Sequence, residues 1–179
     1  MKQVRLALIA MLAFGALAGC GIPSGSPLSV AESVDAEADR AYSIIDMQGI
    51  GPVYAAKLKE AGLSTTSKFL DATKTRKDRQ VLSEKTGISY KLVLRWTRKA
   101  DLMRISGVGV KQADLLEACG VASVKELAQR NAKNLTERVW AANNVAQPFV
   151  KGGTPTETRI TAWIAAAKTI AQQVDDEQP

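Results

Sequence analysis

The feature that most constrains the fold is a short glycine pattern that the chain contains twice. Adding 58 to each position of the first copy gives the second: Gly49, Gly51, Ala55, Leu58 and Gly62 become Gly107, Gly109, Ala113, Leu116 and Gly120. Two glycines around an apolar residue permit positive φ and close backbone approach, so each copy predicts a tight hairpin between two helices. A repeat at fixed spacing indicates a repeated unit. We therefore expect an all-α fold made of two tandem units.

The rest of the chain carries helix signals rather than strand signals. We expect helices from Asp35 to Met47, from Tyr90 to Ile105 into the second hairpin, and over residues 135–143 after a cap at Asn134. Residues 154–157 begin the last helix, with Thr154 as its cap. We expect one packed domain over residues 35–173, with repeat one at about 41–98, repeat two at about 99–173, and a solvated acidic tail at 174–179.

Two tryptophans extend the repeat beyond the hairpins. Trp96 and Trp163 each lie in the last predicted helix of their unit, but they are 67 residues apart rather than 58. The second unit is therefore expected to hold about nine extra residues, placed in the loop over residues 147–153.

The N-terminus has the pattern of a secretory signal. Lys2 and Arg5 precede an uncharged stretch over residues 6–19, which ends in Leu-Ala-Gly before Cys20. This ending resembles the bacterial lipobox, which implies cleavage before Cys20 and acylation of that residue. We expect a signal peptide at 1–19 and a lipidated, flexible tether at 20–34. The residue after Cys20 is Gly21 and not the aspartate that acts as a retention signal at the second mature position. If the host has two membranes, this favours sorting of the protein to the periplasmic side of the outer membrane. Alternatively, the signal is cleaved elsewhere and Cys20 is a bystander.

The composition offers little for catalysis. The chain has no histidine, the commonest general base and metal ligand. We therefore expect no enzymatic activity, no metal and no cofactor. Cys119 occupies the position of Ala61 in the first copy, so we expect a small buried apolar residue; a reactive thiol is the alternative.

Positive charge is concentrated in the middle of the chain. Without Lys2 and Arg5, 22 basic and 18 acidic residues remain, a net charge of +4, and residues 74–99 alone net +7. A candidate basic patch is formed by Lys91, Arg95, Arg98 and Lys99. It could bind the phosphates of DNA or of lipid headgroups, or it could be the solvated face of an amphipathic helix.

Both hairpins resemble the helix-hairpin-helix motif. In that family the hairpin binds a DNA phosphate through backbone N–H groups without reading bases. The resemblance implies possible phosphate sites at Gly49 and Gly51 and at Gly107, Gly109 and Lys111. The first copy has no cation after its glycines, whereas the second has Lys111. The alternative is that the glycines serve only to let the helices pack closely.

Over residues 41–144 the chain also resembles an uncharacterised bacterial family, known only as a domain of unknown function, with the last helix as an extension. Two function hypotheses follow. The first is a lipid-anchored, non-enzymatic binding or scaffold module that contacts an envelope protein. The second is an extracytoplasmic protein that binds DNA independently of sequence.

Overall fold

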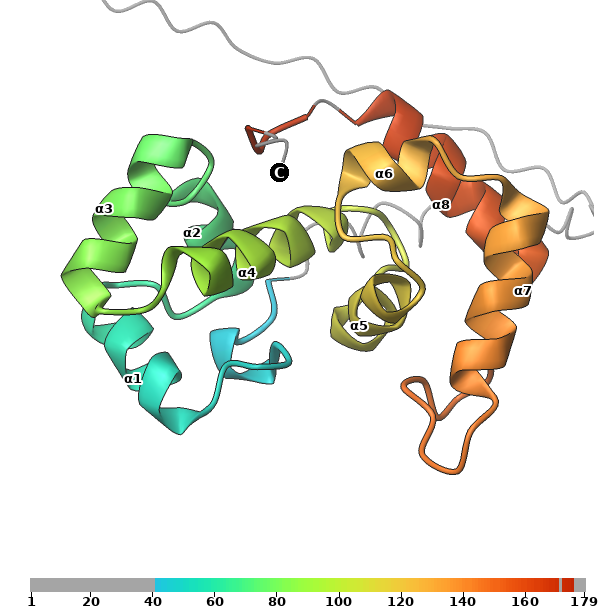
Figure 1. Ribbon diagram of the computed structural model, residues 1–179, viewed down its shortest axis with the longest axis horizontal. Helices are drawn as coiled ribbons and strands as arrows, with labels where there is room; N and C mark the ends of the chain where they lie inside the picture. The colour runs from blue at the N-terminus through green and yellow to red at the C-terminus, as the bar shows by residue number, and fades with distance from the viewer. Residues whose placement is uncertain (1–40, 171, 176–179) are drawn as a thin grey trace, which may run out of the picture.

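The computed structural model describes residues 41–170 and 172–175, and within them the chain is all helical (Figure 1). The predicted all-α fold is confirmed. A short 3-10 helix, η1 (Ile44–Asp46), precedes the α-helices, whose bounds are α1 (Pro52–Glu60), α2 (Thr66–Asp71), α3 (Arg76–Thr86), α4 (Tyr90–Leu102), α5 (Val110–Ala118), α6 (Val124–Ala128), α7 (Ala132–Asn143) and α8 (Glu157–Thr169). The predicted signal peptide, Cys20 and the tether lie outside the described residues.

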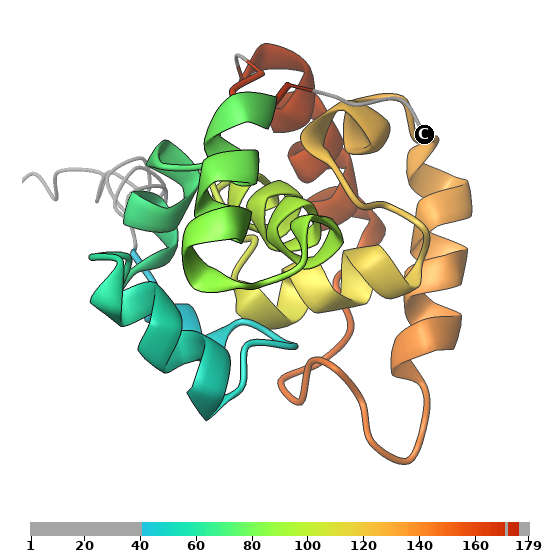
Figure 2. The same ribbon diagram turned by 60° about the vertical axis from the view of Figure 1, so that its left-hand side comes forward.

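Helix α4 is the central element of the domain. It contacts α2 and α3 on one side and α5 and α6 on the other. Figure 1 shows α1 to α3 gathered at one end of α4 and α5 to α8 at the other, and Figure 2 shows the remaining helices surrounding it. Its buried apolar residues include Val93, Trp96 and Ala100, which recur at the three- and four-residue spacing of one helix face. Helix α8 closes the far end by packing on α6 and α7.

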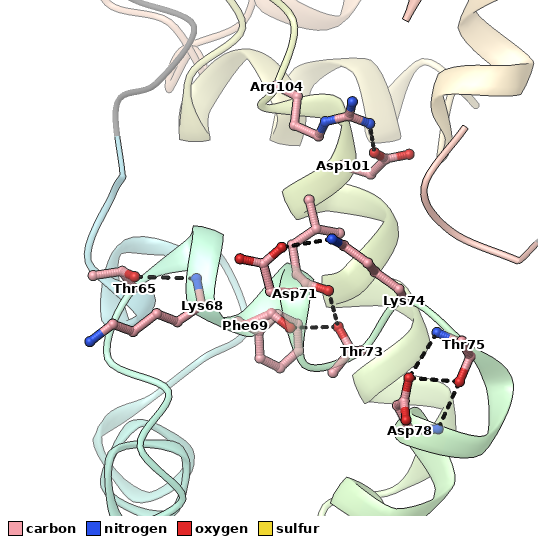
Figure 3. A network of polar contacts seen from close by, with 11 residues as sticks. Thr65, Lys68, Phe69, Asp71, Thr73, Lys74, Thr75, Asp78, Asp101 and Arg104 are labelled. Atoms are coloured by element: carbon pink, nitrogen blue, oxygen red, sulfur yellow. Dashed lines mark hydrogen bonds and ion pairs between the residues drawn. The ribbon is translucent and has the colours of Figure 1, made fainter. Parts of the chain in front are cut away.

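Local sequence signals explain where the short helices begin. Figure 3 shows the connection from α2 to α3, where the Thr73 hydroxyl donates to the Phe69 carbonyl at 2.7 Å. Thr75 then begins α3 with a capping box, in which its side chain accepts from the Asp78 N–H and Asp78 accepts from the Thr75 N–H. Such reciprocal bonds satisfy two N–H groups that the first helical turn leaves open.

The two glycine hairpins have matching local geometry. Helices α1 and α5 each contain nine residues, and both of their bounds are 58 residues apart. Each helix is followed by a glycine at positive φ, 86° at Gly62 and 76° at Gly120, which ends the helix in a left-handed conformation. Helices α4 and α8 each contain 13 residues and begin 67 residues apart.

Four predicted helix ends need correction. Residues 41–43 are not helical, because Tyr42 and Ile44 use their backbone groups to bond residues 64–66, and only η1 follows. Helix α4 ends at Leu102 rather than Ile105. Asn131, not Asn134, caps α7 by accepting from the Asn134 N–H. Thr156, not Thr154, caps α8. In the last two cases two capping residues compete within three positions, and sequence spacing does not decide between them.

The predicted start of the acidic tail also differs from the structure. Val174 is only 3% exposed. The Asp175 N–H donates to the Lys74 carbonyl at 3.2 Å, and the Asp175 carbonyl accepts from Arg79 Nη2 at 3.2 Å. Val174 and Asp175 are therefore part of the packed domain, and Asp175 is bonded to Lys74 and Arg79.

Candidate functional site

Each hairpin turns at a glycine with positive φ, 90° at Gly49 and 78° at Gly107. The apolar residue between the glycines closes the turn: the Ile50 N–H donates to the Met47 carbonyl at 3.0 Å, and the Val108 N–H donates to the Ile105 carbonyl at 2.9 Å. The second glycine is the N-cap of the following helix and supplies no side-chain cap. The first N–H groups of α5, and those of α1 after Pro52, therefore receive no side-chain cap from this glycine and can bond water or a ligand.

An indole lies against the first glycine of each hairpin. A Cβ built on Gly49 would lie 3.3 Å from Trp96 Nε1, and one built on Gly107 would lie 3.3 Å from Trp163 Nε1. Both indoles are buried. Glycine at positions 49 and 107 therefore permits both the positive φ and the close approach of the indole. This supports an architectural role for Gly49 and Gly107.

The second hairpin is surrounded by polar and cationic side chains. The Arg159 guanidinium lies over the Trp163 ring, 6.0 Å from its centroid, and a Cβ on Gly107 would be 3.2 Å from Arg159 Nη2. Gly109 faces the Tyr42 hydroxyl and the Gln112 amide oxygen. Lys111, in the first turn of α5, is exposed. Two cations thus flank the start of α5, where the helix dipole also favours an anion.

A cleft of about 340 Å³ opens beside this hairpin. It is lined by α5, the loop after α7 and the first turn of α8: Gln112, Val150, Gly152, Gly153, Thr154, Pro155, Thr156 and Arg159. Asn143 holds the loop, since its side chain accepts from the Val150 N–H at 2.9 Å and donates to the Val150 carbonyl at 3.1 Å. The loop predicted to hold the extra residues of the second unit therefore forms one wall of this cleft.

The first hairpin presents a different surface. Pro52 occupies the first helical position, where it has no N–H to offer. Val53 is 69% exposed, and the nearby Ile45 is 43% exposed. Tyr54 packs edge-on against Trp96, with ring centroids 5.5 Å apart. This hairpin is therefore apolar where the second is cationic.

The four residues of the predicted basic patch do not share one exposed surface. Lys91 and Arg95 are exposed and Arg98 is half-buried, but Lys99 is only 2% exposed. Lys99 Nζ lies 2.7 Å from Asp114 Oδ1 and 2.8 Å from Glu117 Oε2. It faces α5 because it stands three residues after Trp96 on the buried face of α4. Lys99 is thus not part of an exposed face.

Glu117 holds two of these cations. Arg95 donates to both oxygens of its carboxylate, at 2.5 and 3.0 Å. Partial burial acts to raise the pKa of Glu117, but hydrogen bonds from Arg95 and Lys99 outweigh it and lower the pKa below its ordinary value. The pKa of Arg95 is raised chiefly by its hydrogen bond to Glu117. Glu117 therefore stays ionised and offsets much of the charge expected for the patch.

Several site residues were not predicted from the sequence. Arg159, Tyr42 and Gln112 surround the second hairpin but come from three separate segments. The spacing of 67 residues between the tryptophans offered one signal for Arg159. At this spacing Arg159 is equivalent to Leu92 of the first unit, so an apolar residue in one unit is replaced by a cation in the other. Tyr42 falls in a stretch that the sequence assigned to a helix.

Cys119 is free and buried, in agreement with the expectation of a small buried residue. Desolvation raises the pKa of its thiol, and the charge of Arg138 only partly opposes that shift.

Among the residues that the structure describes, no group of His, Cys, Asp and Glu side chains could hold a metal ion. No helix in the described part of the chain is both long and apolar enough to span a membrane.

Comparison with known proteins identifies the family of the domain. No curated protein and no solved structure matches the chain. A family model described as a domain of unknown function, DUF4332, matches residues 48–170. The match includes α8, so the last helix is part of the family's domain rather than an extension after Asn144. The chain belongs to this family of domains of unknown function, DUF4332.

Proposed function

We propose that this protein is a lipid-anchored, non-enzymatic binding module of the bacterial cell envelope. In this proposal Cys20 carries the lipid, residues 21–34 form the tether, and two tandem helix-hairpin-helix-like units form the binding domain. The second hairpin takes acidic groups of an envelope protein. The lipobox-like ending at Cys20 and the matched geometry of the two hairpins support these assignments.

The observation that carries the proposal is the cationic setting of the second hairpin. Arg159 stacks on Trp163 beside Gly107, and exposed Lys111 lies in the first turn of α5. A guanidinium can bond a carboxylate through two parallel N–H groups, and the open N–H groups of α5 add to the attraction. Together these donors suit the carboxylates of an acidic protein segment.

A protein partner is favoured over DNA by the surface as a whole. The exposed Val53 and Ile45 at the first hairpin offer apolar area, which protein interfaces use and phosphate backbones do not. Glu117 also offsets charge on the predicted basic patch.

DNA remains the second candidate function. The start of α5, with Lys111 next to an uncapped N-terminus, has the chemistry of a phosphate site. Binding of this kind would not depend on sequence, because it reads only the backbone.

Binding measurements distinguish the two candidates. The test protein is the chain from residue 20 with Cys20→Ser, which keeps every described residue. It is titrated with an acidic polypeptide and with duplex DNA of matched charge over a series of salt concentrations. Tighter binding of the polypeptide, weakened by Arg159→Gln and Lys111→Gln but not by the exposed control Lys133→Gln, supports the proposal. Tighter binding of DNA, with a steep fall in salt, supports the alternative. No binding to either at low salt contradicts both.

The anchor is tested separately. Mass spectrometry of the mature chain is expected to find an acylated N-terminal Cys20, and Cys20→Ser is expected to release the protein from membranes. A mature N-terminus elsewhere, without acylation, would contradict this part of the proposal.

A further inference from the structure

The cleft beside the second hairpin is larger than a single acidic group requires. Its volume is about 340 Å³, and the loop that connects α7 to α8 forms one of its walls (Figure 1). A water-sized group takes about 30 Å³, so the cleft holds roughly eleven such groups, whereas a carboxylate fills the space of about three. A ligand that fills the cleft therefore brings more than its carboxylate.

Positive charge surrounds this cleft. Of the described residues that line it, Arg159 alone is charged, and the ion pairs formed among the described residues do not involve Arg159. Its guanidinium stacks on Trp163, which leaves the N–H groups at the edge of its plane for a ligand. Lys111 and Lys151 are exposed, and each stands next to a lining residue in the chain. Glu157 is exposed and does not line the cleft, so the lining itself favours an anion.

Two threonines add hydrogen-bond donors to the lining. Thr154 Oγ1 accepts from Asn143 Nδ2 at 3.1 Å, and Thr156 Oγ1 accepts from the Arg159 N–H at 3.4 Å. Because each hydroxyl oxygen accepts a bond here, its proton can be donated to a ligand. With Arg159, these hydroxyls match a carboxylate, which only accepts hydrogen bonds.

The rest of the lining suits a short stretch of polypeptide. Val150 is half-buried and Pro155 is buried, so they offer an apolar contact for a side chain. Gly152 and Gly153 carry no side chains, and a Cβ added at either position would meet no atom within 4 Å. Glycines of this kind allow a second backbone to approach closely.

We propose that the cleft binds the C-terminal end of a partner polypeptide, with the terminal carboxylate at Arg159 and the last side chain against Val150 and Pro155. This inference rests on the proposed function, because it specifies which acidic group the second hairpin takes. The last two residues of a chain ending in glycylvaline have about twelve heavy atoms, close to the roughly eleven water-sized groups that the cleft holds. The side chain of an internal glutamate has about five heavy atoms and would leave half of this space unfilled.

The experiment is a calorimetric titration of the chain from residue 20 with Cys20→Ser, using three acetylated hexapeptides. The first is acetyl-Gly-Gln-Gly-Ser-Gly-Val with a free C-terminal carboxylate, and the second is the same peptide with a C-terminal amide. The third has glutamate in place of glutamine and a C-terminal amide, so it carries the same charge as the first at an internal position. We expect 1:1 binding of the first peptide, at least tenfold tighter than that of the second, the third or acetate.

The outcomes separate this inference from the proposed function. If the third peptide or acetate binds as tightly as the first, the inference is overturned and the proposed function stands. The same holds if the acidic polypeptide of the earlier titration binds and the first peptide does not. If neither the acidic polypeptide nor any of the peptides binds at low salt, both are overturned.

A matched pair of variants locates the site. Gly152→Leu places a side chain in the wall of the cleft and should weaken binding of the first peptide at least tenfold. Ala146→Leu, at an exposed position of the same loop that does not line the cleft, should leave binding unchanged. Arg159→Lys keeps the charge but loses the paired N–H groups, so it should weaken the first peptide about fivefold. Thermal unfolding checks that each variant is folded, and a folded Gly152→Leu protein that binds the first peptide like the parent would overturn the inference.

Discussion

Lys99 Nζ lies 2.7 Å from Asp114 Oδ1, with the two side chains only 2% and 1% exposed. The pair joins α4 to α5, the first helix after the second hairpin. Removing two charges from water costs several kcal/mol for each ion, which the attraction between them repays only while both are present. The pair therefore fixes how the second hairpin sits on the central helix.

Breaking this pair should destabilise the domain strongly. We expect Lys99→Met to lower the free energy of unfolding by about 3–5 kcal/mol, because Asp114 is left as a buried, uncompensated charge. The double variant Lys99→Met and Asp114→Leu should recover most of that loss. Urea unfolding measures both, with Lys133→Met on the exposed face of α7 as the control. A loss below about 1 kcal/mol for Lys99→Met would contradict the role of the pair.

Acid should weaken the same junction through Glu117. The pKa of Glu117 lies below its ordinary value in the folded protein, so its contribution is fully present above the unfolded-state pKa of about 4.3. It is lost as the pH falls through the lower folded pKa. We expect the free energy of unfolding to drop between pH 5 and pH 3, and to drop less in Glu117→Gln. Equal slopes in both proteins would exclude Glu117 as the cause.

The two glycines of the first hairpin should respond differently to substitution. Gly49 has φ of 90° and faces Trp96 Nε1, whereas Gly51 has φ of −79° and no atom within 4 Å of an added Cβ. Gly49→Ala should cost about 1–3 kcal/mol for the strained backbone. Gly51→Ser should leave the melting temperature unchanged or raise it, since serine is a favoured N-cap. Equal losses would show that the second glycine is needed for another reason.

The C-terminal segment should contribute to stability through Val174. Because Val174 is buried, Val174→Ala should lower the free energy of unfolding by about 1–3 kcal/mol. Asp175 bonds Lys74 and Arg79 through its backbone atoms and the residue is exposed, so Asp175→Ala should change stability by less than about 0.5 kcal/mol. If both variants unfold like the parent protein, the segment is not packed in solution.

The sequence predicted the parts of the fold that depend on local signals. The glycine pattern was sufficient to predict the tight turns at Gly49 and Gly107, and the Thr75 capping box is a local signal of the same kind that marks the start of α3. Lys99 could also have been predicted to be buried, because it stands three residues after Trp96 and four before Met103 on one helix face.

Its partner Asp114 could not have been predicted in this way, since the pairing depends on how α4 meets α5. Likewise, Arg79 lies fully buried and bonds the Thr73 carbonyl and the backbone of Asp175, residues that only tertiary packing brings together. The approach of Arg159 to Gly107 depends in the same way on where α8 packs. Contacts between distant segments therefore determine which side chains surround the second hairpin, and local sequence signals do not predict them.

Backbone amide chemical shifts, mapped by NMR during titration with an acidic polypeptide, locate the binding site on the domain residue by residue. We expect the largest shifts at Val110, Lys111 and Gln112, with a further change at the Arg159 side chain, and their loss in the variant Lys111→Gln and Arg159→Gln. Shifts centred on Val53 at the first hairpin, or shifts that persist in that double variant, would contradict the assignment of the second hairpin as the binding site.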